Sequence, residues 1–260
     1  SSSLYKITPL RYFLEFSYKG TAYHGWQRQP NASTVQQQME DALSTLLGKE
    51  TAVLAAGRTD TGVHAKQMFV HVDLSLTAEA VKQLAHRLNK FLPQDIAIVN
   101  IHPVKADAHA RFDAISRSYA YHLVQFKHPF AHELAYTFTQ PLDWDAMNAA
   151  AKLLLSHTNF KCFSRSKTDV KTYDCKVTTA YWTQSDSEWI FHISANRFLR
   201  NMVRAIVGTL LDVGTGKSSL VDFQAILDSE DRTKAGSSAP AQGLFLTQVQ
   251  YPNTIFETNG

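Results

Sequence analysis

Hydrophobic and polar residues in the first hundred positions follow two periods in alternate segments. Where apolar residues come at every second position, as in RYFLEFSY (11–18), the period is that of a β-strand. Where they recur three and four positions apart, the period is that of a helix. The predicted strands are residues 11–18, 51–56, 67–74 and 96–104. One predicted helix begins at a capping box of Ser33 and Gln36 and ends at Gly48, and the other begins at Thr77 and stops before Pro93.

The second half repeats this order with insertions. Its predicted strands are residues 116–124, 176–184, 188–195 and 243–251, and its predicted helices begin at Asp143, at about Asn196 (to Val213) and at Ser219. We therefore expect an α+β fold of two ferredoxin-like (split βαβ) units whose antiparallel sheets join side by side around a central cleft. The polar stretch KADAHARFD marks the expected boundary between an N-terminal domain of residues 4–107 and a C-terminal domain of residues 108–260.

Composition narrows the class of protein. Hydrophobic residues make up 44% of the chain and charged residues 19%, which is typical of a globular protein and excludes a disordered or fibrous one. The net charge of +3 permits a nucleic-acid partner without requiring one. Cys162 and Cys175 are not spaced as metal ligands and are expected to be reduced and buried. No membrane-length apolar run and no signal peptide are found, so we expect a cytoplasmic protein.

The stretch AAGRTDTGVHAK (55–66) contains the tripeptide Asp60-Thr61-Gly62, which resembles an aspartic-protease half-site. A single such tripeptide, preceded by Arg58 and set between strands of an α/β unit, argues against a protease. Asp60 could instead accept bonds from its own backbone in a hairpin turn. The density of Arg58, Asp60, His64 and Lys66 in so short a loop favours a functional site equally well.

A second candidate is NRFLRNMVRAIVG (196–208). If this segment is helical, Arg197, Arg200, Asn201, Arg204 and Gly208 lie along the side opposite its apolar stripe. Such a basic stripe is usually a solvated helix face. Two details favour a role beyond solvation: no acidic residue shares the stripe, and Gly208 indicates that another segment packs closely against it.

Two aromatic segments allow both a structural and a functional interpretation. Tyr119 and Tyr121 share one face of a predicted strand, where they could form core, sheet surface or a base-stacking platform. In YHGWQRQP (23–30), Trp26, Gln27 and Arg28 fit either an RNA-contacting loop or a loop that an aromatic ring anchors to the sheet. His64 and His71 lack a third ligand at a plausible spacing, so we expect no metal site.

Taken together, seven segments resemble the TruA family of tRNA pseudouridine synthases. They are YHGWQRQ, STVQ, GRTDTGVHA, RFDA, RSYAYHL, FLRNMVR and APAQGLFLTQVQY, in this order and over nearly the whole chain. GRTDTGVHA is a highly specific run, and its agreement with the other six makes coincidence improbable. The resemblance implies an enzyme that converts uridine to pseudouridine at positions 38–40, in the anticodon arm of tRNA.

The resemblance also implies roles for individual residues. Asp60 corresponds to the catalytic aspartate, Arg204 to its basic partner and Tyr119 to the active-site tyrosine. Leu244 or Leu246 would line the pocket. Arg58 corresponds to the residue that takes the place of the flipped base. The further residues expected to contact RNA are Gln27, Arg28, His64, Lys66, Arg197 and Arg200.

Family members are homodimers in which one tRNA touches both subunits, and we expect the same here. No cofactor, metal or membrane is implied, because the reaction is an isomerisation. The alternative is a tandem RNA-binding protein without catalysis that uses its sheets as platforms. That alternative predicts aromatic RNP strands, which the sequence lacks.

Overall fold

The computed structural model describes residues 7–165, 170–185 and 187–258. The chain forms two compact units: unit 1 holds the chain up to Ile115 together with the segment from Gln248 onward, and unit 2 holds Ser116–Thr247. The C-terminal segment packs within unit 1, where the backbone N–H of Ile115 donates to Gln250 and the Tyr251 hydroxyl donates to Ala110. The division between the units therefore differs from the predicted one, which lay between residues 107 and 108. Residues 4–6 and 259–260 of the predicted domains lie outside the described residues.

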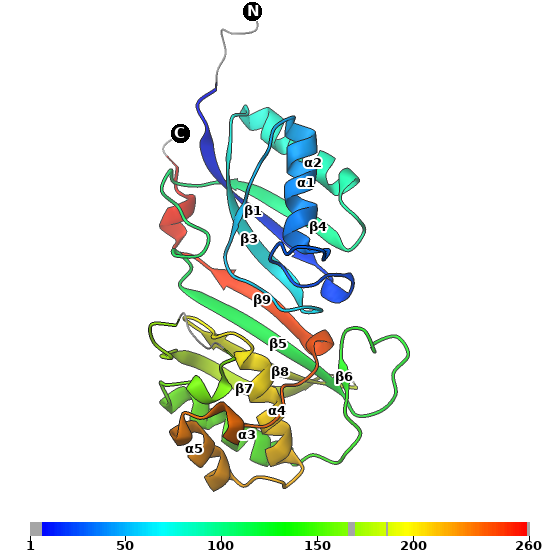
Figure 1. Cartoon of the computed structure of the whole chain (residues 1–260), viewed down its shortest axis with the longest axis vertical. Helices are drawn as coiled ribbons and strands as arrows, with labels where there is room; N and C mark the ends of the chain where they lie inside the picture. The colour runs from blue at the N-terminus through cyan, green and yellow to red at the C-terminus, as the bar shows by residue number, and fades with distance from the viewer. Residues whose placement is uncertain (1–6, 166–169, 186, 259–260) are drawn as a thin grey trace, which may run out of the picture. The chain divides into compact units, whose positions relative to one another are not determined.

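Unit 1 contains an antiparallel sheet covered on one face by two helices (Figure 1). Its strands follow the order β4-β1-β3, and β2 pairs with β3. The elements are β1 (Leu10–Tyr18), α1 (Val35–Leu47), β2 (Leu54–Ala55), β3 (His64–Leu74), α2 (Ala78–Phe91) and β4 (Ile96–Pro103). The 3₁₀ turns η2 (Gly20–Ala22) and η7 (Asn253–Phe256) belong to the same unit.

The helix boundaries of unit 1 follow local chemistry. Thr77 caps α2 as predicted, because its side chain accepts a hydrogen bond from the backbone N–H of Ala80. Gly48 ends α1 in the left-handed conformation, with φ of 70°. The predicted capping box at Ser33 is wrong by one residue: Thr34 is the cap and accepts from the backbone N–H of Gln37.

In unit 2 the strands follow the order β5-β8-β7 with antiparallel pairing, and β6 pairs with β5 in parallel. The elements are β5 (Ser116–Val124), β6 (Tyr136–Thr137), α3 (Trp144–Leu153), η3 (Leu154–Ser156), η4 (Lys161–Phe163), β7 (Val177–Ser185), β8 (Glu188–Ala195), α4 (Met202–Gly214), α5 (Leu220–Ser229), η5 (Arg232–Lys234), η6 (Ala241–Gly243) and β9 (Leu244–Gln250). The first four residues of β9 belong to unit 2 and its last three to unit 1. The predicted mixed α+β class is confirmed.

The start of α4 corrects the sequence prediction. The helix was expected from Asn196, but it begins at Met202, after Asn201 adopts the left-handed conformation with φ of 66°. The preceding residues are held outside a helix: the Asn196 side chain accepts from the backbone N–H of Lys176, and Arg197 donates to the carbonyls of Thr172 and Asp174. Arg197 and Arg200 therefore precede the helix and do not form a helical stripe with Arg204.

Both cysteines are buried and unpaired, as predicted. Burial raises the pKa of Cys162 to about 12 and that of Cys175 to about 11. Within the described ranges, no helix combines the length and hydropathy that a membrane span requires.

Candidate active site

Asp60 lies in the loop that joins β2 to β3 in unit 1. The loop leaves the sheet after Ala56, whose backbone N–H donates to Phe69, and it turns where the N–H of Val63 donates to the carbonyl of Asp60 at 3.1 Å. Gly62 makes the turn possible, since its φ of 82° is unfavourable for other residues. Asp60 is partly exposed. Its carboxylate is thus carried on a tight turn rather than on a regular strand.

Residues 18–26 hold this loop in place through three hydrogen bonds. The hydroxyl groups of Tyr18 and Thr59 lie 2.7 Å apart and are buried. The backbone N–H of Trp26 donates to the carbonyl of Thr59 at 3.2 Å, and the N–H of Gly62 donates to Tyr23 at 3.3 Å. These bonds reach the residue before Asp60 and a residue just after it, so they fix the Asp60 backbone from both sides.

Two glycines let the supporting segment approach the Asp60 loop closely. A Cβ on Gly25 would lie 2.5 Å from the carbonyl oxygen of Thr59, and Gly25 also has φ of 78°. A Cβ on Gly20 would lie 1.9 Å from the carbonyl oxygen of Val63. Both distances are too short for any side chain, so glycine is required at both positions. Gly20 and the following YHGWQRQP segment therefore support the Asp60 loop, a role that was not predicted although the two glycines indicated a close approach.

Trp26 and Tyr23 anchor this support to the rest of unit 1. The Trp26 ring is buried 5.6 Å from the Phe16 ring, which confirms the anchoring interpretation of its loop. The Tyr23 hydroxyl donates to the Asp95 carboxylate at 2.5 Å. Burial, with a further contribution from Asp95, raises the pKa of Tyr23, so the phenol stays protonated.

The predicted RNA-contacting residues of unit 1 differ in their surroundings. His64 is 1% exposed, and its Nδ1 accepts a hydrogen bond from the backbone N–H of Gly20 at 2.9 Å. It therefore helps to hold the segment that supports the Asp60 loop. Arg28 is paired with Glu40 at 3.1 Å and Asp41 at 3.3 Å on α1. Arg58, Gln27 and Lys66 are exposed. Arg58 makes no hydrogen bond or ion pair with the residues that the structure describes.

In unit 2, Arg204 lies on α4 beneath a strap formed by residues 236–240. Its Nε donates to the Ala239 carbonyl at 2.8 Å, and the backbone N–H of Ala239 donates to the Arg204 carbonyl at 2.9 Å. A Cβ on Gly208 would lie 1.6 Å from the carbonyl oxygen of Ser237. The close approach predicted from Gly208 is therefore confirmed, and it holds the strap against the helix one turn beyond Arg204.

The two tyrosines of β5 have different environments. Tyr121 is fully buried, and its hydroxyl donates to the Pro240 carbonyl at 2.7 Å. It is a core residue that also binds the strap of residues 236–240. Burial raises the pKa of Tyr121. Tyr119 is half-buried and meets the Phe198 ring edge-to-face at 4.9 Å. This contact gives Tyr119 a defined orientation while leaving part of its side chain accessible.

The remaining predicted residues of unit 2 lie on β9 and in the segment before α4. Leu244 and Leu246 are buried. Arg197 is half-buried by its bonds to the 172–174 segment, and Arg200 is exposed. In the part of the chain that the structure describes, no three His, Cys, Asp or Glu side chains are grouped so that they could hold a metal ion.

The chain is similar to known proteins over nearly its whole length. A family model described as tRNA pseudouridine synthase matches residues 16–113 and 150–252. A Porphyromonas gingivalis protein named tRNA pseudouridine synthase A is 52% identical over 95% of this chain and 99% of its own length. A relative of the same name from Bacteroides fragilis is 51% identical over 95% of this chain and 98% of its own length. Another, from Syntrophomonas wolfei, is 39% identical over 92% of this chain and 96% of its own length.

Proposed function

Because the chain belongs to the tRNA pseudouridine synthase family, we propose that it isomerises uridine to pseudouridine in the tRNA anticodon arm, at positions 38–40, with Asp60 as the catalytic residue. The observation that carries the proposal is the construction of the Asp60 loop. A carboxylate stands on a turn fixed by Tyr18, Tyr23 and Trp26, two residues after an exposed arginine. A rigid loop with one accessible carboxylate suits a reaction that needs a positioned acid, base or nucleophile.

The chemistry requires one bond exchange and one proton exchange within the same nucleotide. The N1–C1′ glycosidic bond breaks, the uracil turns, and a C5–C1′ bond forms, while a proton leaves C5 and one is gained at N1. No atom is added or lost, so no cofactor is required. A carboxylate can assist by attacking the sugar or the ring, or by removing a sugar proton, and it remains a good leaving group.

We propose that Arg204 is the basic partner of Asp60. A carboxylate that RNA closes off from water is shifted towards its neutral form, and an adjacent guanidinium opposes this shift. The hydrogen bond from Nε to the Ala239 carbonyl holds the guanidinium of Arg204 against residues 236–240. Tyr119 would stack on the target base and handle the proton that leaves C5. Leu244 or Leu246 would line the pocket.

RNA binding is proposed to depend on exposed cations. Arg58 would fill the gap that the flipped uridine leaves, because a planar guanidinium can stack on bases and bind phosphate. Gln27, Lys66 and Arg200 are exposed and suited to direct contact. Arg28 and Arg197 already have protein partners and would have to share them. For His64 we propose the supporting position described above in place of direct contact.

The finer fold and the setting of the enzyme are also proposals. The strand orders β4-β1-β3-β2 and β9-β5-β8-β7 support two ferredoxin-like units whose antiparallel sheets join side by side around a central cleft.

The family resemblance supports a cytoplasmic homodimer in which one tRNA touches both subunits. Light scattering of the purified chain tests the dimer, because a monomeric mass would contradict it.

The deciding experiment incubates the protein with unmodified tRNA in the presence of EDTA and maps pseudouridine by sequencing. We expect product in the anticodon arm from the wild-type chain. The variant Asp60→Asn should bind the same tRNA and yield no product. Asp107→Asn, an exposed aspartate of the same unit, is the matched control and should behave as wild type. Binding without product from the wild-type chain would instead favour the RNA-binding alternative.

The proposed pairing of Asp60 with Arg204 has its own test. Arg204→Leu should reduce product formation at least a hundredfold, because it leaves the carboxylate without its cation. Arg204→Lys should restore part of the activity. If Arg204→Leu is as active as the wild-type chain, Arg204 has no part in the reaction.

A further inference from the structure

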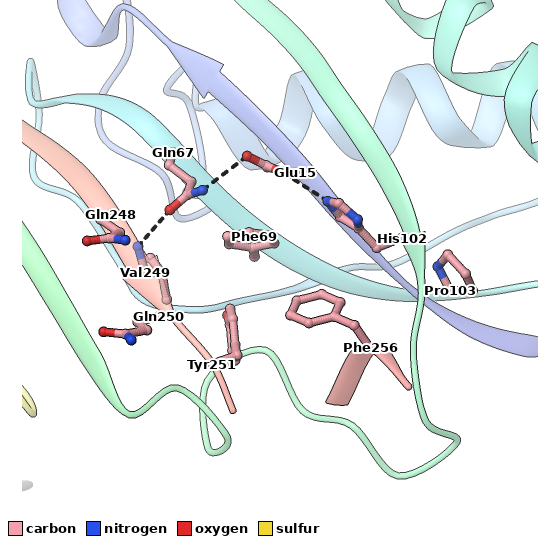
Figure 2. A pocket seen from close by; sticks show the side chains of 10 residues that line it. All are labelled: Glu15, Gln67, Phe69, His102, Pro103, Gln248, Val249, Gln250, Tyr251 and Phe256. Carbon is pink, nitrogen blue, oxygen red and sulfur yellow. Dashed lines mark hydrogen bonds and ion pairs between the residues drawn. The ribbon is translucent and has the colours of Figure 1, made fainter. Parts of the chain in front are cut away.

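A pocket of about 350 Å³ lies on the sheet of unit 1 (Figure 2). Its lining comes from β1, β3, β4, β9 and the segment that ends in η7, all within unit 1. Glu15 alternates along β1 with the buried Leu14 and Phe16, so its side chain points to the opposite face of the sheet from theirs. The volume is at the small end of ligand pockets, which run from about 300 to 1,000 Å³.

A row of three polar side chains forms one side of the pocket, and hydrogen bonds fix each of them. Gln67 accepts from the backbone N–H of Val249 at 3.0 Å and donates through Nε2 to Glu15 at 3.0 Å. The second oxygen of Glu15 pairs with His102 Nε2 at 2.8 Å. The bond to Val249 sets the orientation of the Gln67 amide, and that orientation sets the carboxylate of Glu15.

The row retains hydrogen-bonding capacity after these contacts. A carboxylate has about four acceptor positions and an amide NH₂ has two donors. Glu15 uses one position on each oxygen, and Gln67 uses one N–H, in the bonds given above. Two carboxylate acceptor positions and a neighbouring amide donor therefore remain on side chains that hydrogen bonds already hold in place.

Aromatic rings form the rest of the pocket. Phe69 and Tyr251 meet edge-to-face with centroids 5.2 Å apart, and Phe256 stands 6.3 Å from Tyr251 and 5.4 Å from the His102 ring. Figure 2 shows these rings beside the polar row. Phe69 and Tyr251 are buried, whereas Phe256 is partly exposed and borders the opening.

We propose that this pocket binds a nucleobase by its Watson–Crick edge, with guanine as the preferred base. Two adjacent N–H donors, as on guanine N1 and N2, match the two acceptors of Glu15, and the aromatic rings contact the face of the base. A phosphate would be repelled by the carboxylate, and an apolar ligand would leave the polar row without partners. The inference rests on the proposed function, because the RNA substrate is one source of such a base. A free guanine nucleotide is the other source.

The test measures binding in the Asp60→Asn background, so that the RNA is not modified during the experiment. Glu15→Gln removes the charge and one acceptor at nearly constant volume, and its matched control is Glu79→Gln, an exposed glutamate on α2. We measure the Kd of an anticodon-arm RNA by fluorescence anisotropy and the Kd values of GMP, AMP, CMP and UMP by NMR titration. Circular dichroism and thermal unfolding confirm that each variant is folded.

We expect GMP to bind more tightly than the other three mononucleotides, and Glu15→Gln to weaken this binding about tenfold while Glu79→Gln does not. If RNA supplies the base, Glu15→Gln weakens RNA binding by a similar factor. Abasic substitution of a single unpaired nucleotide then weakens binding to the parent protein but not to Glu15→Gln. If free nucleotide is the ligand, GMP binding responds to Glu15→Gln but RNA binding does not.

The proposal is overturned if no mononucleotide binds and Glu15→Gln leaves RNA affinity unchanged. It is also overturned if Glu15→Gln changes the mass measured by light scattering, because the pocket would then be a contact between copies of the chain. Pseudouridine formation by the wild-type chain is assayed separately. Product from that assay together with unaltered affinities would refute the pocket and leave the enzymatic function standing, whereas absence of product would refute the function itself.

Discussion

The hydroxyl groups of Tyr18 and Thr59 are joined by a buried hydrogen bond of 2.7 Å, at the residue directly before Asp60. Tyr18 is the last residue of β1, so the bond ties the Asp60 loop to a strand in the middle of the unit 1 sheet. Buried polar groups of this kind cost about 1–3 kcal/mol when one partner is removed. The position of Asp60 is therefore coupled to the sheet through one pair of side chains.

Thr59→Val should lower kcat for pseudouridine formation by about ten- to a hundredfold, since a displacement of 1 Å at a reacting group can cost about a hundredfold. KM should change little, because Thr59 is buried and does not reach the RNA. Thr59→Ser keeps the hydroxyl and should recover most of the activity. Steady-state kinetics of the three proteins provide the measurement, and an equal loss from Thr59→Ser would show that the hydrogen bond is not what matters.

Gly25→Ala should abolish most activity, because its Cβ would meet the Thr59 carbonyl oxygen at 2.5 Å and push the Asp60 loop away. Gly48→Ala is a matched control. Gly48 has φ of 70°, close to the 78° of Gly25, but a Cβ there has no neighbour within 4 Å. Both variants carry the same backbone strain of about 1–2 kcal/mol. Gly25→Ala carries the clash in addition, so thermal unfolding should show a larger loss of stability for it than for Gly48→Ala. Equal losses of activity and of stability in the two variants would contradict the clash.

Sequence periodicity predicted the strands well because a strand repeats every second residue and needs no long-range information. Residues 116–124 and 188–195 form β5 and β8 as predicted. The start of α4 was missed because Phe198 and Leu199 continue the apolar period of the helix. In the structure these two residues precede α4, and the Phe198 ring packs against Tyr119.

In the candidate site, too, features that depend on local sequence could be predicted and those that depend on long-range contacts could not. Asp60 could be singled out from GRTDTGVHA, because a specific motif is local in sequence. Gly20 and Gly25 indicate that another backbone lies close to them, but that this backbone is the Asp60 loop could not be derived, since the two segments meet only after folding. The surroundings of His64 also depend on long-range folding: the resemblance implies an RNA contact, whereas the fold buries the imidazole and bonds it to Gly20.

His71 makes unit 1 sensitive to acid. Burial, followed by the charges of Arg11 and His109, lowers the pKa of His71 from 6.5 to about 4, although Asp73 and Asp113 oppose the shift. A lowered folded-state pKa means that the unfolded chain takes up the proton first. The stabilising contribution is therefore complete above pH 6.5 and is lost as the pH falls towards 4. The loss should be on the order of 2 kcal/mol.

Urea unfolding at pH 7 and pH 4.5 measures this effect. His71→Asn can still accept the hydrogen bond from the backbone N–H of Ala110 but cannot be protonated, so its stability should fall less with acid than that of the wild-type chain. His86→Gln, an exposed histidine on α2, controls for histidine loss in general. An NMR titration that places the His71 pKa near 6.5 would remove the basis of this prediction.

The two thiols should make the folded chain sensitive to base and unreactive at neutral pH. Burial raises the pKa of Cys162 from 9.0 to about 12 and that of Cys175 to about 11, so neither is a thiolate at pH 8. A raised folded-state pKa contributes stability below pH 9.0 that is lost as the pH rises towards 11 and 12. A disulfide reagent at pH 8 should label neither thiol until urea unfolds the chain, and then both.

Between pH 8 and pH 10 the free energy of unfolding should fall by about 1–2 kcal/mol more than in a Cys162→Ala, Cys175→Ala variant. Rapid labelling of the folded chain, or identical pH dependence of the two proteins, would mean that the thiols are accessible to solvent.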